Sequence, residues 1–244
     1  MPSFKALPLQ DCNLHQERID VWQFSLEAEF AGAKSLLITD EQERAKRYYF
    51  ARHRRRFTIA RAVLRLILAR YLRLLPHQLK FAYSPHGKPM LLNTPPIQFN
   101  ISHSQDTALL AVGKDYPLGV DIEFFSARPY EGIANHLFSE EEYEALLALP
   151  SSLKPFGFFH IWAQKEALIK ACGLGLSYPT KQITLPILPS EKQMIYDSLH
   201  QQAWRITSFA PKIASCAALC YNPGIQEIRY LALNELSVLH DENI

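Results

Sequence analysis

Three acidic side chains and one lysine lie in two short stretches whose spacing could build a site for phosphate chemistry. GVDIE is predicted as a strand, on which Asp121 and Glu123 point to the same face. The stretch Phe158–Ser177 is predicted to hold a helix that ends at Gly173, and Glu166 and Lys170 lie one turn apart on it. Carboxylate oxygens suit Mg²⁺, which usually completes its coordination with water and substrate phosphate oxygens. The two stretches therefore indicate a Mg²⁺ site with a lysine beside it.

Each of these stretches also has a simpler, structural interpretation. A Glu–Lys pair at i, i+4 on a solvated helix contributes only ~0.2–0.5 kcal/mol. An Asp-x-Glu strand face can point into solvent without binding an ion. His103 follows a predicted strand end, yet no second His or Cys stands at metal-ligand spacing beside it. The chain also lacks the GxSxG motif of Ser–His hydrolases and the glycine patterns of nucleotide-binding loops.

Basic residues gather in one part of the chain. Of the 26 Lys and Arg residues, 13 lie between Lys34 and Lys80, against three acids. Arginine clusters are natural receptors for phosphate, although Arg54–Arg56 and Arg61 could also form a solvated helix face. A nucleic-acid-binding protein would use such a surface, but it would leave the acidic residues unexplained. The net charge of +2 does not favour a nucleic-acid or membrane partner.

Hydrophobic patterns predict the elements that would hold these residues. Alternating apolar residues predict strands, and a 3.6-residue period predicts helices. The predicted strands in the first part of the chain cover 21–26, 80–83, 97–101, 107–112 and 118–123, and a GKDYP turn joins the last two. Later strands are predicted at 194–196, 204–209, 214–221 and 228–233, and these suggest antiparallel sheet. Thr39 or Asp40 is expected to cap one helix, a second helix covers 53–74, and a third begins at Ser139 with a capping box to Glu142. Pro95–Pro96 favours a division into lobes 1–95 and 96–244.

Composition is that of a globular protein, with 48% hydrophobic and 20% charged residues. The four cysteines have no disulfide-framework or zinc spacing, so we expect them to be reduced. The N-terminal stretch has no apolar signal core, and no apolar run reaches the ~18 residues of a membrane span. These features predict a cytoplasmic protein.

Several motifs in order resemble the 4′-phosphopantetheinyl transferases of the surfactin-synthetase-activating (Sfp) type. They are GKP at Gly87–Pro89, FNISHS at Phe99–Ser104, GVDIE at Gly119–Glu123, FSxxEY at Phe138–Tyr143 and WxxKExxxK at Trp162–Lys170, followed by GLGLS. The resemblance spans roughly 39–177, more than half of the chain, and an ordered set of motifs is far more specific than any single one.

The resemblance implies an enzyme that transfers 4′-phosphopantetheine from coenzyme A to a serine of an apo acyl or peptidyl carrier protein, with Mg²⁺ as cofactor and adenosine 3′,5′-bisphosphate released. Fatty-acid, polyketide and non-ribosomal-peptide synthesis use such carriers. The implied fold is α/β (α+β): two lobes related by a pseudo-twofold axis, each a helix on a small, mostly antiparallel sheet, with coenzyme A between them. A chain that contains its own cleft is expected to be a monomer.

The family's site residues are carried over by position. Asp121, Glu123 and Glu166 would hold the metal, and Lys170 would neutralise charge on the phosphates and the leaving group. The remaining coenzyme A contacts implied are Lys88, Pro89 and Ser102 at the adenine end, and His103, Arg56 and Arg44 at the 3′-phosphate.

Several points stay open at this stage. The base that takes the serine proton is Glu166 or a water held by the metal, and Arg54, Arg55 or Arg56 makes the 3′-phosphate contact. Glu41 stands where the family often has a lysine. Phe124, Phe125 and Tyr130 either meet the carrier or pack internally. A non-catalytic protein that binds coenzyme A or a nucleotide is the alternative function, although the acidic residues and Lys170 argue against it.

Overall fold

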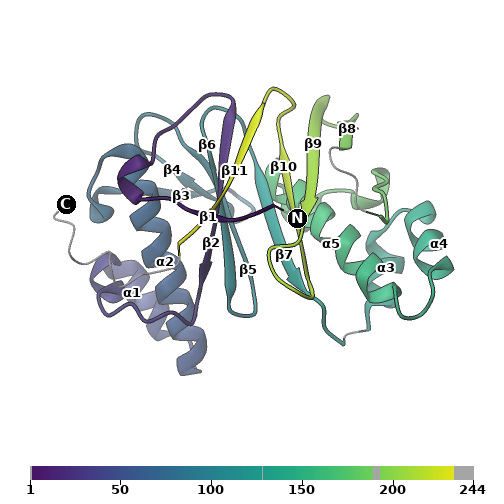
Figure 1. Cartoon of the computed structure of the whole chain (residues 1–244), viewed down its shortest axis with the longest axis horizontal. Coiled ribbons are helices and arrows are strands. Elements are labelled where there is room, and N and C mark those ends of the chain that lie inside the picture. The colour runs from purple at the N-terminus through teal and green to yellow at the C-terminus, as the bar shows by residue number, and fades with distance from the viewer. Residues whose placement is uncertain (1, 128, 189–192, 234–244) are drawn as a thin grey trace.

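The computed structural model describes residues 2–127, 129–188 and 193–233. Two long helices, α2 (Ala51–Leu72) and α5 (Lys154–Cys172), lie on the outer sides of two sheets that face each other (Figure 1). One core fills the space between α2 and the first sheet, and another lies between α5 and the second. A third apolar cluster, with Val21, Leu109 and Val120 at its centre, lies between the two sheets. The fold is therefore mixed α and β in two lobes, as expected.

The first sheet has five strands in the order β1-β11-β2-β6-β5. Their bounds are Lys5–Ala6 (β1), Glu227–Ala232 (β11), Arg18–Ser25 (β2), Thr107–Gly113 (β6) and Gln98–Ser104 (β5). Strand β11 runs parallel to β1 and β2, whereas β2, β6 and β5 pair antiparallel. The expectation that the last strands are all antiparallel is therefore wrong for β11, because the chain crosses back to the first sheet.

The second sheet has four antiparallel strands in the order β7-β10-β9-β8. Their bounds are Gly119–Phe124 (β7), Ser215–Tyr221 (β10), Gln202–Phe209 (β9) and Gln193–Asp197 (β8). Val120 and Ile122 point into the apolar cluster between the sheets. Asp121 and Glu123 therefore face α5, which is the alternation that the sequence predicts.

Shorter elements complete the two lobes. Helices α1 (Thr39–Lys46), α3 (Tyr130–Leu137) and α4 (Glu140–Ala148) cover the ends, and β3 (Phe81–Tyr83) and β4 (Pro89–Leu91) form a two-stranded ribbon. Single 3₁₀ turns occupy 9–11, 33–36, 76–78, 175–177 and 180–182. The predicted capping box of α4 is confirmed by hydrogen bonds in both directions between Ser139 and Glu142. Within the described ranges, no helix combines the length and apolar character that a membrane crossing requires.

The chain passes between the sheets at the GKDYP turn. β6 and β7, which this turn joins, belong to different sheets and do not pair with each other. The division into 1–95 and 96–244 stays a prediction; β5 and β6, which follow that boundary, hydrogen-bond into the sheet of β2.

Helix α1 begins at Thr39, and its cap is Ile38 rather than Thr39 or Asp40. The Glu41 carboxylate accepts a hydrogen bond from the Ile38 N–H.

Candidate active site

Helix α5 lies directly against strand β7, and Gly119 permits this contact. A Cβ atom added at Gly119 would overlap the carbonyl oxygen of Ala167 and the amide nitrogen of Ala171. Any side chain here would push the helix away from the strand, because backbone atoms cannot move aside cheaply. Gly119 therefore sets the distance between the strand of Asp121 and the helix of Lys170. Sequence reasoning gave this glycine no role of its own.

Asp121, Ser102 and Lys170 form a hydrogen-bonded triangle that joins three elements. Lys170 Nζ lies 2.6 Å from Asp121 Oδ1 and 2.9 Å from Ser102 Oγ, and Ser102 Oγ donates to Asp121 Oδ1 at 2.7 Å. Asp121 is only 4% exposed. Its second oxygen, Oδ2, has no hydrogen-bond partner among the described residues. A buried carboxylate oxygen without a partner is costly, and it is the kind of atom that ligates a cation.

Side chains of β5 connect the two sheets next to this triangle. Asn100 Oδ1 accepts from the Val120 N–H at 2.9 Å, and Ser104 Oγ accepts from the Phe124 N–H at 3.2 Å. Ser104 Oγ also lies 3.3 Å from Glu123 Oε2. Among the described strands, β7 pairs along its main chain with β10 alone, so alternate residues of β5 satisfy its other edge. The same contacts hold the two carboxylates of β7 in place.

Glu166 and Trp162 project from α5 toward the carboxylates. Trp162 stacks on Phe158 and donates its indole N–H to Glu123 Oε1 at 3.0 Å. Burial raises the pKa of Glu166; Lys170 lowers it, and the negative charges of Asp121 and Glu123 raise it further. The three predicted metal ligands therefore lie close enough to repel one another.

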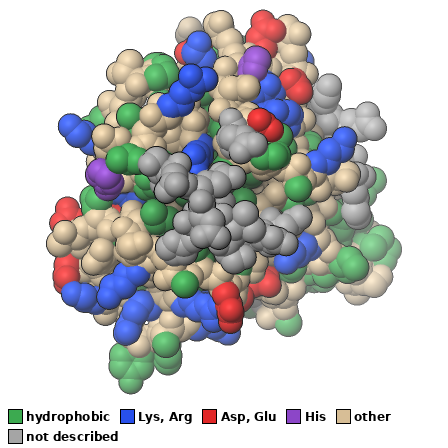
Figure 2. All heavy atoms as spheres, turned by 60° about the vertical axis from the view of Figure 1, so that its left-hand side comes forward, with side chains coloured by type: hydrophobic (Ala, Val, Ile, Leu, Met, Phe, Trp, Pro, Cys, Tyr) green, Lys and Arg blue, Asp and Glu red, His purple; other side chains and the backbone are tan. Residues whose placement is uncertain are grey.

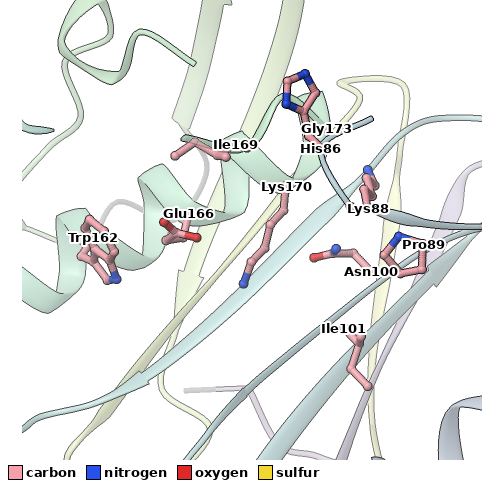
Figure 3. Close-up of a pocket in the computed structure, with 12 residues that line it drawn as sticks. His86, Lys88, Pro89, Asn100, Ile101, Trp162, Glu166, Ile169, Lys170 and Gly173 are labelled. Carbon is pink, nitrogen blue, oxygen red and sulfur yellow. The ribbon is translucent and has the colours of Figure 1, made fainter. Parts of the chain in front are cut away.

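A cavity of about 460 Å³ lies beside these groups. Figure 3 shows Trp162, Glu166 and Lys170 on α5 along one side, with Lys88, Pro89 and Asn100 on the other. The rest of the lining comes from His86, Gly87, Ile101, Ile169, Gly173 and Gly175. Four predicted site residues thus line one cavity, although they lie in stretches about 80 residues apart in the sequence.

Two models of known protein families match the two halves of this chain. A family model described as the 4′-phosphopantetheinyl transferase superfamily matches residues 117–218, and one described as 4′-phosphopantetheinyl transferase, N-terminal, matches 20–114. The chain is 36% identical over 215 residues to the 4′-phosphopantetheinyl transferase HetI of Nostoc sp., covering 84% of this chain and 88% of that protein. It belongs to the 4′-phosphopantetheinyl transferase family.

Two more distant relatives agree with this assignment. The 4′-phosphopantetheinyl transferase Sfp of Bacillus subtilis is 32% identical over 145 residues, which are 59% of this chain and 64% of Sfp. The human L-aminoadipate-semialdehyde dehydrogenase-phosphopantetheinyl transferase is 26% identical over 216 residues, covering 75% of this chain and 68% of that protein. The protein is therefore an enzyme of the transferase class, and the resemblance noted from its motifs is confirmed.

Lys88 of this transferase has a structural contact that its motif does not predict. Its Nζ donates to the carbonyl oxygens of Leu118 at 3.1 Å and Ala171 at 3.2 Å. The side chain thus joins the GKP turn to the start of β7 and the end of α5. Burial lowers the pKa of Lys88 to about 8. The amine is therefore close to its titration range near neutral pH, whereas an ordinary lysine is not.

Of the three neighbouring arginines, Arg56 is the one whose positive charge acts on His103. The pKa of His103 is lowered by its partial burial and by the positive charges of Lys170 and Arg56. Arg56 also pairs with Glu27, at 2.7 Å. Arg54 and Arg55 instead donate to main-chain carbonyl oxygens of Tyr48 and Glu27. Which of the three holds a phosphate stays a prediction, but Arg56 alone influences His103.

Other arginines of the basic segment have structural partners. Arg65 is fully buried and donates to both oxygens of Glu41, at 2.6 and 2.9 Å, and Arg61 pairs with the same carboxylate. Glu41 thus ties α1 to α2 and has a structural role. Arg44 lies over the Phe57 ring in a second hollow of about 300 Å³ between α1, α2 and β3. It does not line the cavity of Lys170.

Lys165, which has no evident role in the sequence, holds the segment that follows α5. Its Nζ lies 2.9 Å from Glu142 Oε2 and donates to the carbonyl oxygens of Thr180 and Ile183 at 2.7 and 2.8 Å. Both side chains of the ion pair are at most 2% exposed. Glu142 therefore caps α4 and also balances the buried positive charge of Lys165 on α5.

Two of the aromatic residues after GVDIE pack internally. Phe125 stacks on Phe159, and Tyr130 packs on Phe158. Both contacts form part of the apolar core that packs against α5. Of the two interpretations that the sequence left open for these residues, the structure supports internal packing for Phe125 and Tyr130.

The residues present fit a hard divalent cation. Three neighbouring carboxylates, one with an unpartnered buried oxygen, are an all-oxygen donor set of the kind that Mg²⁺ prefers. No group of three or more His, Cys, Asp and Glu side chains within the described ranges is already arranged around a metal position. Lys170 and Trp162 donate hydrogen bonds to carboxylate oxygens of Asp121 and Glu123, which are atoms that could otherwise bind a cation. The assignment of Asp121, Glu123 and Glu166 as ligands stays a prediction.

Proposed function

We propose that this transferase moves 4′-phosphopantetheine from coenzyme A to a serine hydroxyl of an apo carrier protein and releases adenosine 3′,5′-bisphosphate. One observation carries the proposal: a single cavity is lined on one side by Glu166 and Lys170 and on the other by Lys88 and Pro89. A pyrophosphate near the carboxylates and lysine would leave the adenine end of coenzyme A near the GKP turn. The reduced state of the four cysteines accords with a cytoplasmic enzyme.

The transfer forms one bond and breaks one. The serine oxygen attacks the β-phosphorus, which carries pantetheine, and the bond from that phosphorus to the bridging oxygen of the pyrophosphate breaks. Lys170 places its positive charge where the leaving bisphosphate gains negative charge. Glu166 is suited to accept the serine proton, because burial and its acidic neighbours raise its affinity for a proton. Ser102 orients Lys170, and Trp162 orients Glu123.

Asp121, Glu123 and Glu166 would hold Mg²⁺. When bound, the cation supplies charge neutralisation at the pyrophosphate oxygens. His103 and Arg56 provide a separate positive region for the 3′-phosphate, and Arg44 lies in a hollow of its own. The protein's own groups would thus face both the pyrophosphate and the 3′-phosphate of coenzyme A.

A labelling assay tests this function. The protein is incubated with Mg²⁺, apo carrier proteins and coenzyme A that carries a fluorophore on its thiol. We expect covalent label on the carrier and none on a carrier whose acceptor serine is replaced by Ala. Asp121→Asn should abolish labelling and weaken Mg²⁺ binding measured by calorimetry, while circular dichroism stays unchanged. Binding of coenzyme A with no label on any carrier would refute the transferase reaction and favour a non-catalytic binding protein.

A further inference from the structure

Residues 46–55, called here the basic tip, join α1 to the first turn of α2. We propose that the basic tip and the hollow beside it dock an acidic, amphipathic helix of the carrier protein that supplies the serine. This inference rests on the proposed transferase function, since it concerns the second substrate of the same reaction. It assigns a surface that none of the site motifs includes.

Two aromatic side chains protrude from the basic tip. Tyr49 is 89% exposed and Phe50 is 62% exposed, whereas Trp22 of the same lobe is fully buried. Their rings contact each other edge to face, and Phe50 also contacts His53. Large exposed aromatic residues that hold one another in place are typical anchors of protein interfaces. Figure 2 shows a hydrophobic projection with Lys and Arg side chains around it at the lower end of this face.

The charge of the basic tip selects an acidic partner. All five of its charged residues are cations and all are exposed: Lys46, Arg47, Arg52, Arg54 and Arg55. The net charge of the whole chain is only +2, so the rest of the molecule is net acidic. An acidic protein would therefore be attracted to the tip, which orients its approach. The only ion pair in the tip that the described residues form is Lys46 with Glu43.

A shallow hollow of about 290 Å³ adjoins the tip between α2 and the segment 28–34. Its apolar lining includes Phe30, Ala33 and Ile59, and its cations are Lys34, Arg54 and Arg55. Arg54 and Arg55 are braced by hydrogen bonds to main-chain carbonyl oxygens, so their positions are set before a partner arrives. An apolar floor with a basic rim matches a helix that presents apolar side chains on one face and carboxylates beside them.

The basic tip is also close to the active site along α2. Arg52 lies one helical turn before Arg56 on the same face of the helix. Arg56 influences His103, and Ser102, the next residue, contacts Lys170. A carrier held at the tip would thus lie next to the positive region of Arg56 and His103. This position favours a protein substrate of the reaction over an anionic membrane.

Kinetics with the two substrates varied separately test the proposal. In Arg47→Glu/Arg52→Glu and in Phe50→Ala, we expect KM for apo carrier to rise, by about tenfold or more for the double charge reversal, with KM for coenzyme A within about twofold of the wild type. The wild-type KM for carrier should rise with salt, and that of the double variant should rise less, because two of the attracted charges are gone. Lys5→Glu/Lys181→Glu is the matched control, since it changes the charge equally at exposed positions outside the tip.

Direct binding separates this proposal from the reaction itself. Fluorescence anisotropy with labelled apo carrier, without coenzyme A, should show binding that the tip variants weaken and the control retains. Tip-dependent binding without any transfer would sustain the docking surface and refute the proposed reaction. An unchanged KM and affinity for carrier in both tip variants would overturn the docking surface. So would tip-dependent binding to phosphatidylserine vesicles with no effect on the carrier, because the partner would then be a membrane.

Discussion

The Nζ atom of Lys170 lies 2.6 Å from Oδ1 of Asp121, so an ion pair joins α5 to β7 at the edge of the cavity. Lys170→Met removes the positive charge expected at the leaving group. We predict that kcat falls by about 10²–10³-fold, the usual effect of removing one group that stabilises developing charge. Single-turnover labelling of a carrier measures it. Lys170→Arg should recover part of the rate, and a Met variant with wild-type turnover would contradict the role of this lysine.

Gly119→Ala should separate α5 from β7. The added Cβ overlaps main-chain atoms of Ala167 and Ala171. Overpacking of this kind costs about 1–3 kcal/mol of unfolding free energy, and coenzyme A binding should weaken because Glu166 and Lys170 move with the helix. Urea unfolding and calorimetry measure the two effects. Gly132→Ala, where a Cβ meets no atom within 4 Å, is the control and should leave stability unchanged or slightly raised.

The buried pair of Lys165 and Glu142 should show strong coupling. Lys165→Met leaves the Glu142 carboxylate buried without its counter-charge, which typically costs about 3–5 kcal/mol. Adding Glu142→Gln to that variant should restore part of the stability, because the second substitution removes the unbalanced charge. Denaturant titration of the wild type, both single variants and the double variant completes the cycle. Additive losses would mean that the two residues act independently.

Lys88 should make both stability and coenzyme A binding depend on pH. Its pKa is about 8 in the folded protein, because burial disfavours the charged amine, and about 10.4 in an unfolded chain. Between these values the unfolded state binds more protons, so unfolding free energy rises as pH increases from 8 toward 10.4. Affinity for coenzyme A should fall over the lower part of the same range, because the folded amine loses its charge.

Comparison with Lys88→Met isolates this effect. Chemical unfolding at pH 7.5 and 9.5 should give a larger gain for the wild type than for the variant. Calorimetric titration with coenzyme A at the same two pH values should give a larger loss for the wild type. Equal pH dependence in the two proteins would show that other groups cause it.

Much of the fold follows from local patterns in the sequence. The helix predicted within 158–177 is part of α5 (Lys154–Cys172), and it ends at Gly173, whose φ is 74°, as the sequence predicts. The alternation in GVDIE places Val120 and Ile122 in the core and Asp121 on the side of α5. These predictions succeed because the periods of strands and helices depend on residues two to four positions apart.

Other features depend on residues that are distant in sequence. β11 returns to the first sheet parallel to β2, although its pattern is that of any short strand. Lys165 stands in a motif of the site, yet its partners are Glu142 and main-chain oxygens of a later segment. Arg54, Arg55 and Arg56 are indistinguishable by type, and only the direction of each side chain relates Arg56 to His103. Such contacts arise from packing, which periodicity does not describe.

The sequence by itself determined the chemistry available to this protein: three carboxylates, a lysine one turn beyond the third, and a set of ordered motifs that identifies a phosphopantetheinyl transferase. The tertiary structure decided which side chains meet. Gly119 lets α5 approach β7, and the hydroxyl and amide groups of β5 connect the sheets and orient Asp121 and Glu123. The physical reason is that a residue's type sets which bonds it can make, whereas only the folded backbone brings together partners that are distant in sequence, as Asp121 and Lys170 are.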